Sequence, residues 1–275
     1  MKDEVIALLK EFKKIFAWSY QDMPGLNIEI IVHRILVKSE CPLVWQALRR
    51  MKSESILKIK EEVEKQLKAG FLTTIAYSDW VANIVPVPKK DGKVHMCIGY
   101  RDLNRASLKD NFPLPHIDTL MDNTTSNLFF SFMDGFSGYN QIKMAKKDKA
   151  KTVFTTHWGT YAYDVMSFDL KNAGATYQRV MVTLFHNMMH KEIKVYMDDM
   201  IIKSHTPRKD HLIDLRKLFK RRVKYKLRLK PNKCVFEASS RKLLNFIVSQ
   251  KGIEVDPAKV QAIKDMPTSK TEKHV

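Results

Sequence analysis

The sequence predicts an α+β fold built on an antiparallel sheet. Short apolar or alternating segments that suit β-strands are mixed with longer amphipathic segments that suit helices, without the regular strand–helix–strand order of a parallel sheet. Two strand segments flank Asp91-Gly92, a dipeptide typical of tight hairpin turns. The chain contains no G-x-G-x-x-G or Walker sequence, so we expect neither a Rossmann nor a P-loop domain.

The first part of the chain is expected to form a helix, an extended arm and a second helix. Residues 1–50 combine a helical start with irregular segments containing MPGL and CPLVW. Residues 53–71 place apolar side chains at helical spacing up to Gly70, a typical helix stop.

The strands around Asp91-Gly92 form the hairpin expected over residues 81–104. Pro86 and Pro88 place its first strand at a sheet edge or near the end of the strand. Lys89 and Lys90 lie beside its tip, where they either keep the surface soluble or reach phosphate groups.

The remaining elements follow in a mixed order. They are a strand in 128–144 that ends in Asp134-Gly135, a hairpin at 152–170, a long helix at 171–190, a strand pair at 191–204, a helix at 211–225 and a hairpin at 241–255.

The charge of the chain points to a polyanionic partner. Its 275 residues carry 48 Lys and Arg against 30 Asp and Glu, a net charge of +18, which favours nucleic acid as the partner. The basic residues are densest at 217–233. A solvated helix face is the alternative for such a run. The predicted nucleic-acid contacts there are Lys217, Lys220, Arg221, Arg222 and Lys224.

The cysteine spacing and the hydropathy of the chain indicate in which cellular compartment the protein is expected. Cys41, Cys97 and Cys234 are far apart and fit no zinc or disulfide pattern, which indicates a reducing environment. There is no signal peptide and no apolar run that could span a bilayer. We expect an intracellular protein, cytoplasmic or nuclear, that has no membrane partner.

Acidic residues interrupt two otherwise apolar strands. Asp134 ends one, and Asp198 and Asp199 lie at the turn of the strand pair VYMDDMIIKS. If the strands are neighbours, these carboxylates converge and need a cation to neutralise them. Oxygen ligands without His or Cys favour Mg²⁺, and two such ions ~3.5–4 Å apart can activate an attacking oxygen and stabilise a leaving one. Ordinary turn chemistry is the alternative for an isolated Asp pair.

The order of motifs resembles the reverse transcriptase of gypsy-class LTR retrotransposons. The resemblance covers nearly the whole chain and rests on these segments: HRI at 33–35, YRDLN at 100–104, FPLP at 112–115, FMDGFSGYNQI at 133–142, LKNAGATYQ at 170–178, YMDD at 196–199 and KCVFEASSRKLLNFIVSQKGIEVDPAKV near the end.

The resemblance implies a right-handed polymerase fold with fingers, a palm whose antiparallel sheet packs on helices, and a partial thumb. The boundaries it implies are an N-terminal helix and arm at 1–41, fingers at 42–110 and 142–172, palm at 111–141 and 173–248, and the start of a thumb at 249–275.

The resemblance also implies the catalytic centre. Asp134, Asp198 and Asp199 would hold two Mg²⁺ ions, with Mn²⁺ as a substitute, and the backbone carbonyl of Gly135 would be a further ligand. The primer 3′-hydroxyl would attack a dNTP on an RNA or DNA template, with release of pyrophosphate.

Further roles are carried over from the family by position. Tyr139 matches the residue that excludes a ribose 2′-hydroxyl, although a core tyrosine is the alternative. The predicted substrate-binding residues are Lys89, Lys90, His95, Tyr139, Phe168, Asp169 and Lys171. Leu244 and Asn245 fall where the family positions the primer terminus.

Several positions depart from the usual residues of the family. His95 replaces an arginine that holds the triphosphate, and a mostly neutral imidazole is a poor substitute for a bidentate guanidinium. Gly99 replaces Asp and Asn245 replaces Gly. Ser167 and Asp169 replace Pro and Gly, and Asp169 is expected to place a negative charge beside the nucleotide phosphates.

Two functions follow from these observations. The first is an RNA-directed DNA polymerase, favoured by the three aspartates and Tyr139. The alternative is an inactive polymerase-fold remnant that at most binds nucleic acid, favoured by the departures. A metal-dependent nuclease ranks third, because the YMDD hairpin has no His or Glu to activate water. We also expect a fragment of a Pol polyprotein, because the chain ends about where a thumb would continue and contains no protease, RNase H or integrase signature.

Overall fold

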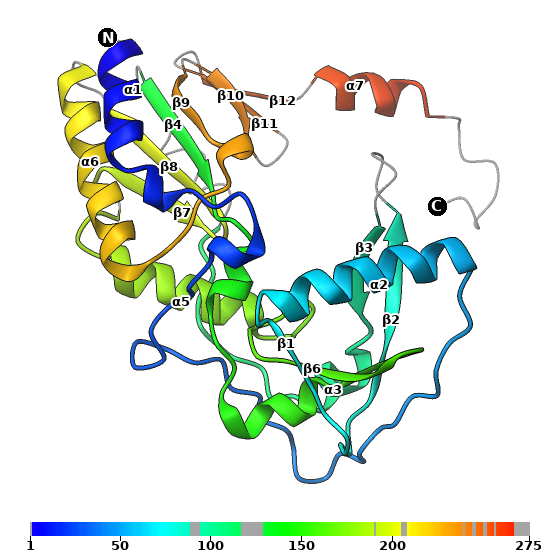
Figure 1. Ribbon diagram of the computed structural model, residues 1–275. Helices are drawn as coiled ribbons and strands as arrows, with labels where there is room; N and C mark the ends of the chain where they lie inside the picture. Colours follow the sequence, from blue (N-terminus) through cyan, green and yellow to red (C-terminus); the bar gives the residue numbers. More distant parts are fainter. Residues whose placement is uncertain are drawn as a thin grey trace.

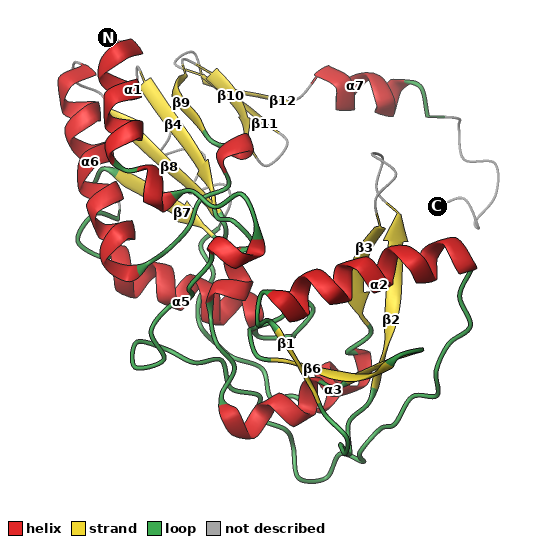
Figure 2. Ribbon diagram, viewed as in Figure 1, coloured by secondary structure: helices red, strands yellow, loops and turns green. Residues whose placement is uncertain are grey.

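The elements of the chain are arranged in two lobes, one above the other in Figure 1. The computed structural model describes residues 2–88, 94–116, 129–189, 191–204, 208–238, 240–243, 246–249, 252–255 and 257–266. The upper lobe contains helices α1 (Lys2–Glu11), α5 (Ala173–Phe185) and α6 (Arg208–Tyr225). The lower lobe contains α2 (Ser53–Lys68) and α3 (Arg101–Ala106) (Figure 2).

The sheet of the upper lobe is entirely antiparallel. Its strand order is β7 (Ile193–Tyr196), β8 (Asp199–Ser204), β4 (Phe129–Asp134) and β9 (Val235–Ala238). Strand β4 lies between two neighbours and buries Phe130, Phe132 and Met133. Successive side chains of a strand point to opposite faces, so β4 is covered on both faces of the sheet. The predicted antiparallel sheet packed on helices is confirmed for this lobe.

The sheet of the lower lobe is mixed. Its order is β1 (Leu72–Thr74), β6 (Gly159–Tyr163), β5 (Phe154–Thr156), β2 (Ala82–Pro88) and β3 (Val94–Ile98). Strands β2 and β5 run parallel and all other pairs are antiparallel. The sequence did not predict this parallel pair.

The predicted hairpin at 81–104 is confirmed as the antiparallel pair β2–β3. Strand β5 pairs only with Ala82 and Asn83 of β2. Pro86 and Pro88 therefore have a strand neighbour on one side only, as expected for residues that lack an N–H donor.

The helices bury the faces that their sequence periodicity predicts. Helix α2 buries Ile59 and Val63, four residues apart, and the chain leaves it through Gly70, whose φ of +69° suits glycine. Helix α6 packs against β8 and buries Leu215, Leu218 and Phe219.

The last described elements are a small antiparallel sheet and a helix. They are β10 (Ser240–Leu243), β11 (Phe246–Ser249), β12 (Gly252–Val255) and α7 (Pro257–Lys264). They lie along the top of Figure 1, across from hairpin β2–β3. The boundaries given above for fingers, palm and thumb remain predictions.

One continuous hydrophobic core joins the two lobes. It includes Ile59 of α2, Tyr163 of β6, Met181 of α5 and Phe219 of α6. The lobes therefore pack as one folded unit, and a residue of one lobe can be positioned by the other. None of the helices in the described part of the chain is long and apolar enough to cross a membrane.

Candidate active site

The three predicted catalytic aspartates come from two neighbouring strands and the turn between β7 and β8. Asp134 at the end of β4 is the direct antiparallel partner of Asp199 at the start of β8. Asp198 lies in the turn, and its carbonyl accepts a hydrogen bond of 3.0 Å from the N–H of Gly135. The two strands are neighbours, so the condition for converging carboxylates is met.

The turn that carries Asp198 is fastened to helix α5. Gln178, which is 1% exposed, accepts a hydrogen bond from the N–H of Met197 (3.0 Å) and donates one to the carbonyl of Val195 (3.3 Å). Met197 has a φ of +50°, a left-handed backbone conformation that residues other than glycine rarely adopt. The buried amide of Gln178 thus holds a strained turn in one position.

Two glycines and a tyrosine leave little room around Asp198. A methyl group at Gly138 would overlap Oδ1 of Asp198 and lie 2.7 Å from the Tyr177 hydroxyl. A methyl group at Gly135 would lie 3.1 Å from the same hydroxyl. Glycine is required here because of close approach, and φ is not positive at either position.

Burial sets the electrostatics of Asp198. Desolvation, followed by the neighbouring charge of Asp134, raises the pKa of Asp198 to about 7. Its Oδ1 is buried and accepts no hydrogen bond of good geometry from the residues that the structure describes, although the nearby Tyr177 hydroxyl partly opposes the rise in the pKa of Asp198. Such an oxygen is costly unless a cation binds it.

Two basic side chains lie close to the aspartates. The ammonium group of Lys233 is 2.7 Å from Oδ2 of Asp134. Arg222 is 1% exposed, donates to the Met200 sulfur and has a pKa lowered by burial, although the charges of Asp198 and Asp134 partly oppose that shift. Its burial corrects the prediction that Arg222 contacts nucleic acid.

The donor set at this turn suits a hard divalent cation. Carboxylate oxygens are the ligands that Mg²⁺ and Mn²⁺ prefer, and Oδ1 of Asp198 is an oxygen without a partner. Within the described part of the chain, no three Asp, Glu, His or Cys side chains are already grouped closely enough to hold one ion. Lys233 occupies part of the space at Asp134, so metal binding requires this ammonium group to move.

Tyr139 lies beside the turn that carries Asp198. Its hydroxyl donates to the Met197 sulfur (3.4 Å), and its ring is 5.2 Å from that of Tyr177. Burial, followed by the charge of Asp198, raises the pKa of Tyr139 to about 12. It is therefore a neutral phenol at any physiological pH.

The rings of His95, in β3, and of Phe168, in the segment between β6 and α5, stack on each other. Their ring centroids are 5.1 Å apart with an interplanar angle of 23°. Phe168 is 43% exposed, so it presents an aromatic surface to solvent.

The side chain of Asp169 points toward the backbone of β3. Its carboxylate accepts a hydrogen bond of 2.9 Å from the N–H of Ile98, and its φ is not positive. Burial raises its pKa to about 6. The carboxylate is therefore tied to the backbone of β3, and the backbone at Asp169 does not require glycine. The expected negative charge beside the nucleotide phosphates stays a prediction.

The other predicted substrate and nucleic-acid residues fall in several places. Lys171 donates to the carbonyl of Ser107 (2.8 Å). Lys89 and Lys90 lie outside the described residues, as do Leu244 and Asn245.

The predicted contacts on helix α6 do not form one free surface. Lys217 pairs with Asp214 (2.9 Å) and Glu192 (3.5 Å), and Arg221 donates to the carbonyl of Leu184. Only Lys220 and Lys224 extend as exposed side chains that no acid neutralises among the described residues. Figure 1 places α6 at the outer edge of the upper lobe.

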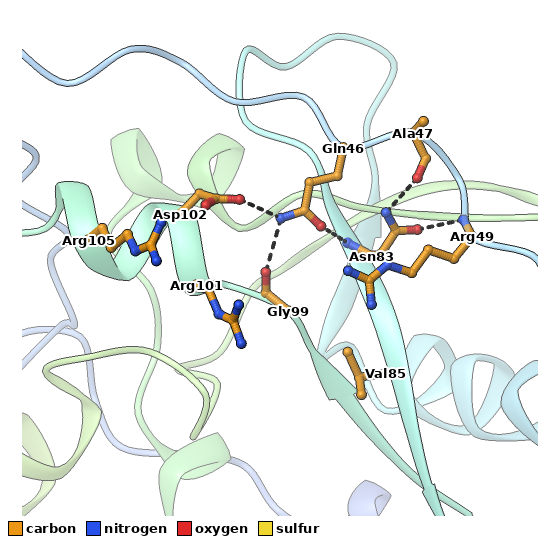
Figure 3. A pocket seen from close by; sticks show the side chains of 9 residues that line it. All are labelled: Gln46, Ala47, Arg49, Asn83, Val85, Gly99, Arg101, Asp102 and Arg105. Carbon is orange, nitrogen blue, oxygen red and sulfur yellow. Dashed lines mark hydrogen bonds between the residues drawn. The ribbon is translucent and has the colours of Figure 1, made fainter.

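A basic pocket of about 620 Å³ lies in the lower lobe. Figure 3 shows Arg49, Arg101 and Arg105 around it, with Asp102 as its single acid. Gln46 fixes one wall by donating to Asp102 (2.8 Å) and to the carbonyl of Gly99 (3.3 Å). Because glycine replaces the usual Asp at position 99, the arginines dominate the charge of this pocket.

Sequence reasoning missed three residues of the site. Lys233 lay within a basic run that gave it no distinction, and its contact with Asp134 spans 99 residues of sequence. Tyr177 and Gln178 belong to the predicted helix 171–190 and are both buried. Helical periodicity shows which residues are buried, but it does not show which of them also support the turn that carries Asp198.

Carboxylates paired across neighbouring strands, next to a third at a tight turn, fit the metal sites of enzymes that act on phosphate groups with divalent ions. The comparisons with known proteins define the class more closely. The family described as "Reverse transcriptase (RNA-dependent DNA polymerase)" matches residues 87–265, and the chain belongs to this family.

The relatives are Pol polyproteins of transposons. The chain is 28% identical over 272 residues to the retrovirus-related Pol polyprotein from transposon 297 of Drosophila melanogaster, covering 98% of this chain and 25% of the relative. It is 34% identical over 215 residues to that from transposon gypsy of the same organism, covering 76% of this chain and 21% of the relative. The resemblance to gypsy-class elements is confirmed, and the chain spans about a quarter of the length of these relatives.

The fold agrees with solved reverse transcriptases. The foamy viral protease-reverse transcriptase in complex with double-stranded DNA superposes with a TM-score of 0.90 at 22% identity, over 99% of this chain and 47% of that chain. The same viral protein in complex with an RNA/DNA hybrid gives 0.87, over 99% of this chain and 36% of that chain. The predicted polymerase fold is confirmed.

Proposed function

We propose that this chain is a working RNA-directed DNA polymerase domain that extends a primer with dNTPs by two-metal phosphoryl transfer. The observation that carries the proposal is the buried carboxylate of Asp198, with its raised pKa and an oxygen that has no hydrogen-bond partner. A turn that served only the fold would gain stability by losing this group, so its presence favours a retained catalytic role.

The residues of the site have distinct roles in this proposal. Asp134, Asp198 and Asp199 would hold two Mg²⁺ ions, for which Mn²⁺ can substitute. The chemistry that such ions supply when bound is activation of the primer hydroxyl and neutralisation of the charge that develops on the phosphates. Tyr139, next to the turn, would exclude a ribose 2′-hydroxyl.

The positions of the departures favour activity over the inactive alternative. The Asp169 carboxylate is held by the N–H of Ile98, so it does not reach out toward a triphosphate as a free side chain would. His95 stacks on Phe168, which leaves a surface for a nucleobase or sugar but no guanidinium for the triphosphate. We therefore expect a reduced affinity for dNTP with the catalytic step retained.

The nucleic acid would contact the chain at more than one place. The foamy viral protease-reverse transcriptase, which shares this fold, was solved in complex with double-stranded DNA and with an RNA/DNA hybrid. By analogy, we propose a template-primer duplex as the partner of this chain. The three arginines of the lower-lobe pocket would bind template phosphates without reading the sequence. Protease, RNase H and integrase would be supplied by other parts of a Pol polyprotein.

Primer extension tests this proposal. The wild-type chain, incubated with Mg²⁺, dNTPs and a DNA primer on an RNA template, should add nucleotides, and the Asp198→Asn/Asp199→Asn variant should not. No extension by either protein, with duplex binding retained, would support the inactive alternative.

A second variant tests the triphosphate site separately. His95→Arg should lower KM for dNTP about tenfold or more, because a bidentate guanidinium replaces an imidazole, while kcat changes little. An unchanged KM would mean that His95 does not contact the triphosphate.

A further inference from the structure

The N-terminal arm forms one wall of a long groove on the side of the molecule near the end of α6. Two hollows of about 480 and 610 Å³ adjoin along the arm and share Ile28 and Lys143. The first lies against the end of α6, and the second against residues 143–149. We call the two together the arm groove. None of the three catalytic aspartates lines it.

The arm groove is strongly basic. Six side chains supply positive charge and form no ion pair among the described residues: Arg34, Lys143, Lys146, Lys147, Lys224 and Lys226. Its single acid, Asp164, is paired with Lys149 at 2.5 Å. The residues that line the groove therefore carry a net positive charge.

The walls of the arm groove are held in place by backbone hydrogen bonds. The N–H of His33 donates to the carbonyl of Lys143 (2.8 Å), and the N–H of Ala145 donates to the carbonyl of His33 (2.8 Å). The ring of His33 is buried against the Thr176 hydroxyl (2.9 Å), which fastens the arm to α5. The groove is thus formed before any ligand arrives, so binding costs little ordering of the chain.

Glycine allows the arm to approach its support closely. Gly25 has a φ of +76°, and a methyl group there would lie 3.3 Å from the carbonyl oxygen of Gln141. At the opposite wall, Lys226 follows α6 with a φ of +58°. The chain thus turns sharply there and brings Lys226 to the groove.

Apolar and aromatic side chains lie among these cations. Ile28 is 60% exposed and Ile30 is 38% exposed. Tyr225 lies in the wall with the ammonium group of Lys224 5.3 Å from its ring centroid. Basic residues that track a backbone, with aromatic or apolar surfaces between them, are the combination that binds single strands of nucleic acid.

We propose that the arm groove binds single-stranded nucleic acid through its phosphates, without sequence preference and separately from the active site. Cations with apolar and aromatic side chains among them suit the backbone and the accessible bases of a single strand, whereas the bases of a duplex are stacked inside it. The site does not depend on the polymerase activity, and its failure would leave that proposal untouched.

Fluorescence anisotropy with a labelled dT12 or U12 oligonucleotide tests the proposal in the absence of Mg²⁺. The test variant is Lys143→Glu/Lys147→Glu/Lys224→Glu. The control variant, Lys10→Glu/Lys13→Glu/Lys14→Glu, makes the same change in net charge at exposed lysines outside the groove. Melting curves show that each variant is folded, and Lys→Gln at the same three positions replaces the test variant if it is not.

The groove variant should bind the oligonucleotide at least tenfold more weakly than wild type. The slope of log affinity against log salt should become about 2 units shallower, since roughly 0.7 counterions are released per phosphate contact in a single strand. The control variant should lose less than threefold. An equal loss in both variants would overturn the proposal, because net charge alone would then explain binding.

Two further probes define the ligand. A blunt 12-bp duplex should bind the groove and control variants alike, and a selective loss with the groove variant would overturn the single-strand assignment. Poly-glutamate of matched charge should compete poorly with dT12. Competition as strong as that of unlabelled dT12 would mean that the groove takes an acidic polypeptide, which also contradicts the proposal.

Discussion

Close packing around one buried oxygen governs the active site at the scale of single residues. Oδ1 of Asp198 lies against the Tyr177 hydroxyl and the backbone of Gly138, with no hydrogen-bond partner among the described residues. Small changes in the residues that surround this oxygen should therefore have large effects on activity.

Gly138→Ala should reduce primer extension by about 100-fold or more, because its methyl group displaces Asp198 or Tyr177 and misplacement by about 1 Å has that effect. Gly174→Ala is the matched control, since its methyl group would meet only Met197 Cε at an ordinary 3.5 Å. Steady-state kinetics of the two variants make the comparison. Equal rates for both would show that the tight approach at Gly138 has no catalytic importance.

Asp169 should give stability a measurable pH dependence. An acid whose pKa is higher in the folded protein, here about 6 against an ordinary 3.8, lowers stability once it ionises. The penalty is absent below about pH 4, complete above about pH 6, and as large as about 3 kcal/mol. Asp169→Asn should therefore gain stability over wild type as the pH rises through this window, measured by urea unfolding. A constant difference from pH 4 to 7 would contradict this.

At the scale of elements, helix α6 combines a buried apolar face with basic residues whose exposure varies widely. Its apolar residues Leu215, Leu218 and Phe219 are buried against the upper sheet, while its basic residues range from fully buried Arg222 to exposed Lys220. A run of basic residues thus does not by itself define a surface.

The end of α6 contains a strained residue that predicts a stabilising substitution. Lys226 has a φ of +58° directly after the helix, where glycine is preferred. Lys226→Gly should raise the free energy of unfolding by about 1 kcal/mol. The same substitution within the helix, Lys220→Gly, should lower it by about 1 kcal/mol. Thermal or urea unfolding checks both signs, and a loss at position 226 would mean that its side chain stabilises the fold.

Local elements were predictable from the sequence, and long-range pairings were not. The hairpin β2–β3 and helix α2 depend on turn residues and periodicity within about 20 residues, so their patterns sufficed. The parallel pairing of β2 with β5 joins segments about 70 residues apart, and no local pattern specifies it.

The candidate site divides in the same way. Asp134, Asp198 and Asp199 were predictable because acids that interrupt apolar strands violate the burial rule. Lys233 and the inward turn of Asp169 were not, because an ion pair or a hydrogen bond between distant segments leaves no mark on the local sequence.

At the scale of the whole molecule, buried histidines fasten segments that are far apart. His33 bonds to Thr176 across 143 residues, and His211 lies 2.8 Å from the Ser131 hydroxyl across 80 residues. Burial lowers the pKa of both rings to about 4. Both are therefore neutral in the folded protein at pH 7.

Acid should unfold the protein partly through these two rings. A histidine whose pKa is lowered by folding contributes stability that is present above about pH 6.5 and lost as the pH falls toward 4. The loss is at most about 3 kcal/mol for each ring, which outweighs the relief from protonating Asp169. His33→Gln/His211→Gln should be less stable at pH 7 but should lose less between pH 6.5 and 4. Parallel pH profiles for variant and wild type would refute this account.

The carboxylates of Asp134, Asp198 and Asp199, at the end of β4, in the β7–β8 turn and at the start of β8, are proposed to hold a divalent cation. Electron paramagnetic resonance titration with Mn²⁺ tests this central claim without requiring nucleic acid. Wild type should bind Mn²⁺, Mg²⁺ should compete for the same site, and binding should be lost in Asp134→Asn and in Asp198→Asn/Asp199→Asn. Binding that survives unchanged in those variants, or is absent from wild type, would contradict the claim.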